Sequence, residues 1–471
     1  MGQEISDSHF QAEDFEAFWL RLQQETRLLE QWLEEGYFSR GEQLVGFELE
    51  AWIVDEHRRP APLNQQLLER LNDPLVVPEL ARFNLEFNGT PQRLTGSAFS
   101  RLADELQRTW SRCNQAAGEL NTRLAMIGIL PTVLARDLNR GNMSSMQRYY
   151  ALDEQLAQLR GGTPIWIDIQ GRDRLCFSHR DVMLESATTS FQIHLKVDAD
   201  CAGRYYNAAK LVSALMVSVC ANSPYLFGAE LWEETRVPLF EQAVQVIGGE
   251  ASSRVTLGTG YVVSIMDCFR ANLDNYPVLL PQVIDEPEQQ LAHLRLHNGT
   301  IWRWNRPLVG FDGGGRPHIR IEHRVVPAGP SVSDSVANTA FFVGLVCALA
   351  NQPIAPEKRL TFQQAKANFY RAAREGLRAE INWLNGRGVL LRELILNQAL
   401  GFAEKGLGSL GVEPEESRHW LGIIARRVES GQNGATWQRG WVERHGADMA
   451  GLTEAYLECQ ESMRPVHEWA L

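Results

Sequence analysis

The chain has 471 residues, of which 44% are hydrophobic, and a formal net charge of −12. This length can bury one large core or two smaller ones. The acidic balance argues against broad binding to nucleic acid or to an anionic membrane, because both need a basic surface. The seven cysteines form no CxxC pair, so we expect reduced thiols, a cytoplasmic location and no zinc site.

The first part of the chain contains several helical signals. Apolar residues at helical spacing predict a helix over residues 10–35, which Gly36 ends. The same reasoning predicts a short helix over 63–72, a long helix over 98–126, a short strand over 127–132, a helix that ends at 159, and apolar helices over 205–221 and 333–350. The longest apolar runs, 211–221 and 340–350, are too short to span a bilayer, so they indicate buried helices.

Residues 45–54 alternate between apolar and other side chains with period two. Glu48 and Glu50 therefore lie on one face of a predicted strand, and Phe47 and Leu49 lie on the other. Two neighbouring carboxylates repel each other, and burial adds a desolvation cost. The arrangement becomes favourable when a divalent cation such as Mg²⁺ lies between them. The alternative is a half-exposed strand with a charged outer face.

Three later stretches, 81–88, 191–197 and 319–325, alternate in the same way. Their polar faces carry acids, amides, a histidine and arginines, namely Asn84, Glu86, Asn88, Gln192, His194, Lys196, Arg320, Glu322 and Arg324. Four such strands indicate one antiparallel sheet, with one face on the core and the other lined by metal ligands and phosphate-binding arginines. We therefore predict an α+β fold with a curved antiparallel sheet.

Two further strands are predicted between these stretches. Residues 259–265 have a strand-like pattern, and 294–302 suggest a strand and a turn, followed by Arg303 and Arg306. Arginines beside indoles can bind ATP phosphates and stack on a base. The equally acceptable alternative is the rim of a strand with cation–π packing.

The residues after 350 suggest a second, helical part. The linker 353–356 separates a catalytic region, residues 1–352, from a helical C-terminal region, residues 357–471. Helices are predicted over 362–384, 390–405, 414–430 and 447–468, with a polar loop at 431–439. Residues 406–411 match GxGxxG but follow a helix, so they indicate a helix end and a loop, not a dinucleotide site.

The order of these motifs resembles the glutamate–cysteine ligase family and its carboxylate–amine ligase relatives, which share the catalytic fold of glutamine synthetase. The resemblance extends from about Val45 to about Ala350. It rests on the motifs Gly46-x-Glu48-x-Glu50, Leu85-Glu86-x-Asn88, Gln192-x-His194, Asn222-Ser223-Pro224, Asn298 to Arg306, and Arg320-x-Glu322-x-Arg324.

The resemblance implies ATP and Mg²⁺, or Mn²⁺, as cofactors, and small molecules as substrates. It implies metal ligands at Glu48, Glu50, Glu86, Glu322 and His194, and nucleotide contacts at Gln192, His194, Arg303 and Arg306. It places Arg320, Arg324 and Arg236 in the catalytic step. Arg148 is a weaker candidate for binding a substrate carboxylate or phosphate. A surface ion pair is an equal alternative for Arg236.

The resemblance also implies an activity. Ligases of this kind phosphorylate a carboxylate, the γ-carboxylate of glutamate in the family, and an amine then attacks the acyl phosphate. The acceptor is cysteine in the best-known members, as in glutathione biosynthesis, or another small amine. Two alternatives remain open at this stage: a small-molecule phosphotransferase on the same fold, and a non-catalytic relative that binds ATP or glutamate. The sequence specifies neither the acceptor nor the oligomeric state.

Overall fold

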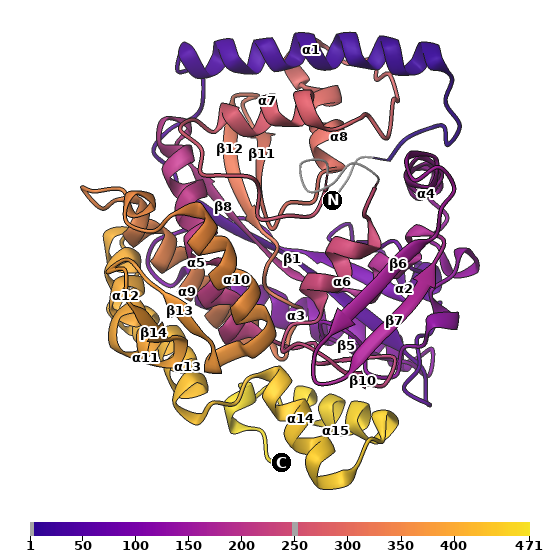
Figure 1. The fold of residues 1–471 in the computed structure, drawn as a ribbon, viewed down its shortest axis with the longest axis vertical. Helices are drawn as coiled ribbons and strands as arrows, with labels where there is room; N and C mark the ends of the chain where they lie inside the picture. The colour runs from indigo at the N-terminus through magenta and orange to yellow at the C-terminus, as the bar shows by residue number, and fades with distance from the viewer. Residues whose placement is uncertain (1–3, 247–252) are drawn as a thin grey trace.

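A curved antiparallel sheet lies at the centre of the protein (Figure 1). The computed structural model describes residues 4–246 and 253–471. The strand order is β11–β12–β8–β1–β3–β2, and β4 and β5 also pair with β1. The strands are β1 (Leu44–Val54), β2 (Val76–Pro78), β3 (Asn84–Asn88), β4 (Gln92–Arg93), β5 (Arg123–Ala125), β8 (Phe191–Val197), β11 (Asn305–Phe311) and β12 (Pro317–His323). The four predicted amphipathic strands are neighbours in the order β12–β8–β1–β3, which confirms the predicted sheet.

The register of these strands aligns their polar residues. Glu50 lies opposite Glu86 on β3, and Glu48 lies opposite Gln192 on β8. On the other side of β8, His194 lies opposite Glu322. Because side chains alternate between the two faces of a sheet, this register brings residues from four strands to one face.

The opposite face of the sheet packs on two long apolar helices, α5 (Ala202–Cys220) and α9 (Val332–Ala350). Phe47 and Phe191 stack there with their ring centroids 5.3 Å apart, and both are buried. Among the described residues, α9 alone has the length and hydropathy of a membrane span, but 89% of its apolar window is buried inside the protein. The prediction that this apolar run is a buried helix is therefore confirmed.

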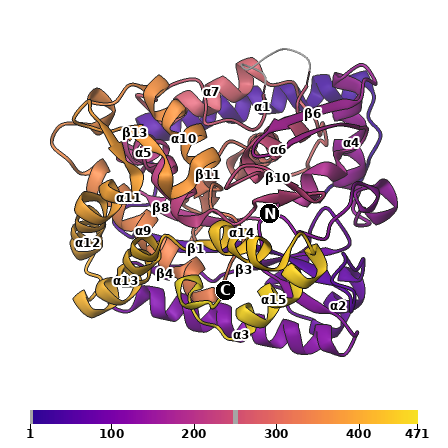
Figure 2. The same cartoon turned by 60° about the horizontal axis from the view of Figure 1, so that its bottom comes forward.

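The remaining helices surround this core. Across one end of the molecule lies α1 (Ala12–Glu34), beside α7 (Met266–Asn275) and α8 (Ala292–Gly299) (Figure 1). The other helices are α2 (Asn64–Leu71), α3 (Ala98–Gly118), α4 (Gln147–Leu159), α6 (Arg236–Ala243), α10 (Phe362–Glu375), α11 (Leu391–Leu394), α12 (Leu400–Ser409), α13 (Pro414–Ser430), α14 (Gly434–His445) and α15 (Met449–Glu461). Figure 2 shows α14 and α15 at the end of the molecule where the C-terminus lies.

The C-terminal helices pack directly against the core helix α9. A Cβ atom added to Gly406 on α12 would lie 1.9 Å from the carbonyl oxygen of Gly344 on α9. A side chain there would clash with backbone, so the two helices touch through their glycines. Gly406, the first glycine of the GxGxxG match, therefore serves helix packing.

Two predicted strands are wrong. Residues 259–265 form no strand, because the side chain of Asn207 satisfies the backbone there: its Nδ2 donates to the Val262 carbonyl at 2.8 Å, and its Oδ1 accepts from the Val262 N–H at 2.9 Å. The stretch 294–302 was predicted as a strand and a turn, but its first six residues belong to α8 (Ala292–Gly299). A short run with a few apolar residues fits a helix as well as a strand.

Other boundaries also differ from the predictions. The predicted polar loop at 431–439 contains the start of α14, where the Asn433 side chain caps the helix by accepting from the Thr436 N–H at 2.9 Å. The predicted helix over 98–126 ends at Gly118, and the strand that follows is β5, not 127–132. A hairpin of β6 (Ile165–Gln170) and β7 (Arg174–His179) was not predicted, although Ile165, Ile167 and Ile169 alternate.

Candidate functional site

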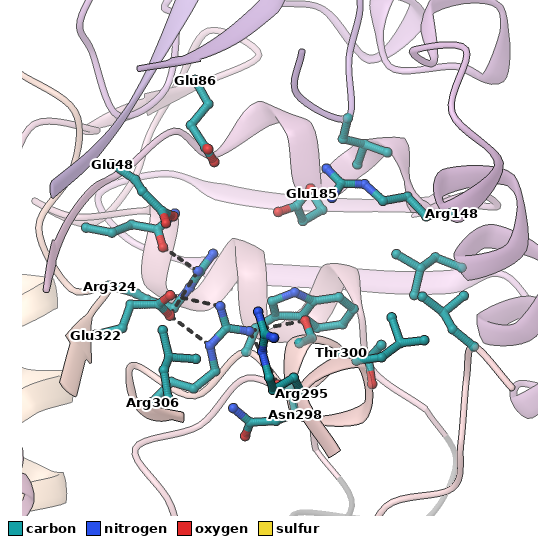
Figure 3. A pocket seen from close by; sticks show the side chains of 18 of the residues that line it. Glu48, Glu86, Arg148, Glu185, Arg295, Asn298, Thr300, Arg306, Glu322 and Arg324 are labelled. Carbon is teal, nitrogen blue, oxygen red and sulfur yellow. Dashed lines mark hydrogen bonds and ion pairs between the residues drawn. The ribbon is translucent and has the colours of Figure 1, made fainter. Parts of the chain in front are cut away.

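A cavity lies over the polar face of the sheet, between α4 on one side and α8 on the other. Its charged lining is unusually dense for a protein interior, with Glu48, Glu50, Glu79, Glu86, Glu185 and Glu322 facing Arg148, Arg295, Arg306, Arg320 and Arg324. Figure 3 shows Glu48, Glu86 and Glu322, with Arg306 and Arg324 in contact with Glu322. Buried charges of this number require partners or bound ions.

The first group of potential ligands consists of Glu48, His194 and Glu322. One ligand atom from each lies within 4.8 Å of the others. The Nε2 atom of His194 is 3.5 Å from Glu48 Oε1 and 3.7 Å from Glu322 Oε1. This Nε2 is buried and has no hydrogen-bond partner among the described residues. Burial lowers the pKa of His194 to about 4, so the imidazole is neutral, which is the form that binds metal ions.

The second group consists of Glu50, Glu79 and Glu86, whose ligand atoms also lie within 4.8 Å of one another. Burial, followed by the charge of Glu79, raises the pKa of Glu50 to about 7. Burial and the charge of Glu48 raise the pKa of Glu86 well above its ordinary value. The neighbouring carboxylates thus oppose one another's ionisation, and a divalent cation between them would reverse this.

Three arginines lie beside the first group. Arg306 forms a two-point contact with Glu322, with distances of 2.8 and 2.9 Å. Arg324 Nη1 donates to Gln192 Oε1 at 2.5 Å and to Glu322 Oε2 at 3.2 Å. Burial opposes ionisation of Glu322, but Arg306 and Arg324 hold its pKa well below the usual range. Arg320 lines the cavity, and its buried Nε has no hydrogen-bond partner among the described residues.

The α4 side of the cavity has a different lining. Arg148 Nη2 donates to the Tyr149 hydroxyl at 2.5 Å. Leu152 and Val182 provide an apolar wall beside it. Burial raises the pKa of Glu185 well above its ordinary value. Figure 3 shows Arg148 on the opposite side of the view from Glu322 and Arg324, with Glu185 between them. This end offers one cation, one acid and an apolar surface.

The α8 side of the cavity carries Arg295, Asn298, Thr300 and Trp302. Arg295 and Asn298 are three residues apart and therefore share a helix face. Arg295, Glu79 and Glu185 were not predicted as site residues. The helical spacing of Arg295 and Asn298 is a signal that could have found Arg295, but this stretch was assigned to a strand.

Three of the predicted residues are not part of the cavity lining. His194 contacts the lining residues Glu48 and Glu322, but Arg303 and Arg236 lie elsewhere. Arg303 is buried, donates to Asn272 Oδ1 at 2.5 Å, and lies with its guanidinium 5.3 Å from the ring centroid of Tyr276. Arg236 is buried behind the cavity, where its Nη2 donates to the backbone carbonyl of Arg324 at 2.9 Å. Both make protein contacts that need no ligand.

The donor set fits hard divalent cations. Mg²⁺ and Mn²⁺ prefer carboxylate oxygens and accept an imidazole, and both groups offer these atoms. Cations bound at the two groups would account for the Nε2 of His194, which has no hydrogen-bond partner among the described residues, and for the close approach of the acids in the second group. The predicted ligands Glu48, His194 and Glu322 fall in the first group, and Glu50 and Glu86 fall in the second.

The fold is that of the carboxylate–amine ligases related to glutamate–cysteine ligase. A glutamate–cysteine ligase from Francisella tularensis, solved in complex with AMP, superposes with a TM-score of 0.59 at 12% identity and covers 89% of each chain. A bifunctional glutathione synthetase from Pasteurella multocida superposes with a TM-score of 0.56 at 12% identity, over 92% of this chain and 54% of the other. At this identity the likeness concerns the fold. A comparison with curated proteins finds no match.

Residues 44–455 match the sequence model of glutamate-cysteine ligase family 2 (GCS2). The chain belongs to this family, which makes it a member of the ATP-dependent carboxylate–amine ligases. The match confirms the resemblance inferred from the motifs, and it also includes most of the helices after residue 350.

Proposed function

We propose that the protein activates the γ-carboxylate of glutamate with ATP, as an acyl phosphate, and joins it to the amino group of a small acceptor. The observation that supports this most directly is the pair of three-ligand groups, Glu48–His194–Glu322 and Glu50–Glu79–Glu86, in one arginine-lined cavity. Phosphoryl transfer concentrates negative charge on oxygen atoms and needs little covalent chemistry from the protein. Cations and arginines fixed in a buried cavity meet that requirement.

The two ligand groups would hold Mg²⁺, which would neutralise charge on the phosphoryl oxygens. The residues of the chain hold the other parts in place. Glu322 is kept ionised by Arg306 and Arg324, so it remains a ligand at neutral pH. Arg320, whose Nε has no protein hydrogen-bond partner among the described residues, is free to donate to a phosphoryl or carboxylate oxygen. The surrounding burial limits competing attack by water on an activated carboxylate.

We assign the nucleotide to the α8 end of the cavity and the acceptor to the α4 end. Trp302 and Arg295 at the α8 end can stack on a base and bind phosphate, and the AMP in the F. tularensis enzyme supports a nucleotide on this fold. At the α4 end, Arg148 can pair with an acceptor carboxylate, and Glu185 can accept the proton that the attacking amine releases.

The test is ATP- and Mg²⁺-dependent phosphate release with glutamate and a set of amino acids and simple amines, with products identified by mass spectrometry. A γ-glutamyl amide formed with equal release of phosphate would support the proposal and identify the acceptor. A stable phosphorylated product without an amide would instead indicate a phosphotransferase. A Glu48→Gln variant serves as the matched control, because it removes one ligand charge with almost no change in size. Phosphate release that persists in this variant would come from a contaminant.

A further inference from the structure

Asn222 lies at the end of α5 and is completely buried, at 0% exposure. Its side chain joins segments that are far apart in the sequence. Its Nδ2 donates to the Ala328 carbonyl and to the Tyr456 hydroxyl, both at 2.8 Å. Its Oδ1 accepts from Gln438 Nε2 at 2.9 Å. Both polar atoms of this amide are therefore fully used, which fixes its orientation.

The two C-terminal helices α14 and α15 supply two of these three contacts. Gln438 belongs to α14 and Tyr456 to α15, and both are buried. The Tyr456 hydroxyl also donates to the Met126 carbonyl at 2.8 Å, next to the end of β5. On the same helix, Gln460 Nε2 donates to the Pro330 carbonyl at 2.8 Å. The two helices α14 and α15 thus hold the segment 328–330, which comes a few residues after the end of β12 at His323.

A second set of contacts leads from Asn222 to the cavity. The Asn222 N–H donates to Glu234 Oε2 at 2.8 Å. The other carboxylate oxygen of Glu234 is 3.5 Å from Arg236 Nε. Arg236 then donates to the backbone carbonyl of Arg324 at 2.9 Å. Arg324 is the residue whose side chain contacts Gln192 and Glu322 in the cavity.

We propose that α14 and α15 form part of the catalytic framework, and that they position Arg324 through Asn222. The contacts reach the segment 324–330 from two directions, through Arg236 at its start and through Asn222 and Gln460 at its end. Arg236 is then a positioning residue and not a group that touches substrate. This inference gives the C-terminal helices a role in the reaction, and it rests on the proposed function of the cavity.

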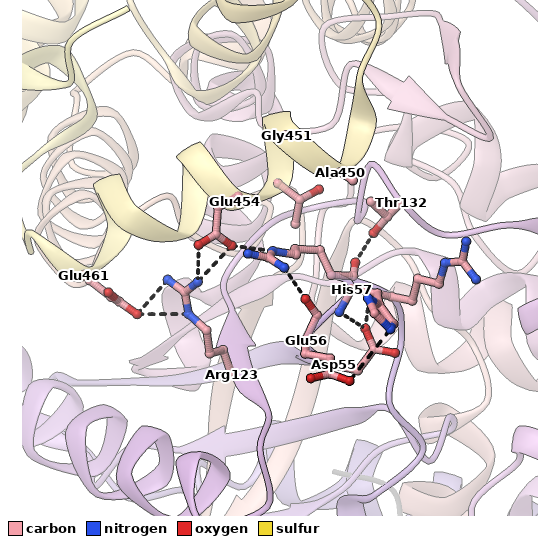
Figure 4. A network of polar contacts seen from close by, with 12 residues as sticks. Asp55, Glu56, His57, Arg123, Thr132, Ala450, Gly451, Glu454 and Glu461 are labelled. Atoms are coloured by element: carbon pink, nitrogen blue, oxygen red, sulfur yellow. Dashed lines mark hydrogen bonds and ion pairs between the residues drawn. The ribbon is translucent and has the colours of Figure 1, made fainter.

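A second attachment of α15 provides a control (Figure 4). At the surface, Arg123 contacts Glu454 at 3.0 Å and Glu461 at 2.7 Å, and Arg58 contacts Glu454 at 2.5 Å. These ion pairs fasten the same helix to β5 and to the turn after β1. They do not involve the segment 324–330. The hydrogen bonds of Tyr456 and the ion pairs of Glu454 can therefore be removed by separate mutations.

The experiment compares Tyr456→Phe with Glu454→Gln in the full-length protein. Tyr456→Phe removes one hydroxyl and keeps the ring, and Gln460 still donates to the Met126 carbonyl at 3.1 Å, so we expect a folded protein. We expect kcat to fall at least fivefold in Tyr456→Phe, with KM for ATP within twofold of the wild type. We expect Glu454→Gln to keep kcat within twofold of the wild type. This should hold even if its melting temperature falls as far as that of Tyr456→Phe.

A crystal structure of Tyr456→Phe gives a readout that needs no turnover. The expected result is an Arg324 guanidinium displaced from Gln192 and Glu322. Unchanged Arg324 contacts would overturn the inference, and so would equal losses of kcat in the two variants. Failure of the wild type to form any amide would contradict the proposed function alone, because the position of Arg324 in the variant is measured independently.

Discussion

The two ligand groups in the cavity differ in how their charge is balanced. In the first group, Glu322 is held by two arginines, Arg306 and Arg324, within 2.8–3.2 Å. In the second group, the donors to Glu50 within the described part of the chain are neutral: the Ser190 N–H and hydroxyl and the Gln192 amide. The first group thus has arginines paired with Glu322, whereas Glu50 in the second group has no ion pair with a described residue.

This difference indicates how each group responds to a cation. Glu322 is ionised before any cation binds, because the arginines hold its pKa low. Glu50 and Glu86 have raised pKa values, so their ionisation at neutral pH destabilises the folded protein. A bound cation would stabilise the ionised carboxylates and offset this cost. We therefore expect cation binding to stabilise the fold chiefly through the second group. Four predictions test this comparison.

The largest effect is expected for Glu322→Gln. The change removes a metal ligand and leaves Arg306 and Arg324 buried without their carboxylate. We expect activity to fall on the order of 10³-fold and the free energy of unfolding to fall by about 3–5 kcal/mol. Amide formation and urea denaturation measure these two quantities. Near-wild-type turnover in a folded variant would remove Glu322 from the metal site.

Glu86→Gln should have the opposite effect on stability. It removes one of three mutually repelling acids, so the metal-free protein should gain about 1 kcal/mol at pH 8. Activity should fall on the order of 100-fold, because a ligand is lost. The rise in melting temperature that Mg²⁺ causes in the wild type should also shrink. If Glu86→Gln were less stable than the wild type, both without metal, the carboxylates of the second group would not repel one another.

Arg320→Lys is expected to lower kcat about tenfold with little change in stability. The cavity-facing guanidinium can donate two parallel hydrogen bonds to a phosphoryl group, and an ammonium cannot reproduce that geometry. Steady-state kinetics and a thermal melt measure both effects. Arg303→Lys serves as its control, since Arg303 contacts Asn272 and Tyr276 outside the cavity lining. Equal losses of kcat in the two variants would refute the distinction.

The smallest effect concerns pH. The pKa of Glu50 is raised from its ordinary value to about 7 in the folded state, so the folded protein binds a proton more tightly than the unfolded chain. Stability from this group is complete below pH 4.5 and is lost as the pH rises to about 7. In EDTA, Glu50→Gln should flatten this part of the stability curve, and excess Mg²⁺ should flatten it in the wild type. An identical pH dependence in wild type and variant, both in EDTA, would contradict the raised pKa.

The sheet and much of its polar face could be predicted from the sequence because the alternation of side chains along a strand determines both. Period-two alternation places Glu48, Glu50, Glu86 and Glu322 on known faces, and the antiparallel register then brings them together. Glu79 follows β2 and Glu185 lies in a short turn of 3₁₀ helix. Their positions depend on how distant segments pack, and no local periodicity encodes that. For the same reason, local pattern did not separate Arg306, which reaches the cavity, from Arg303, which does not.

The helix α9 is synthesised before the helices that cover it. The second half of this helix is apolar, and the helix is covered by α12 and α13, the later of which ends at Ser430. During translation the helix therefore leaves the ribosome well before the segments that cover it. Exposed apolar surface of this kind promotes aggregation and attracts chaperones. Truncation before residue 400 should therefore yield insoluble protein, even though most of the cavity residues are already present in the shortened chain.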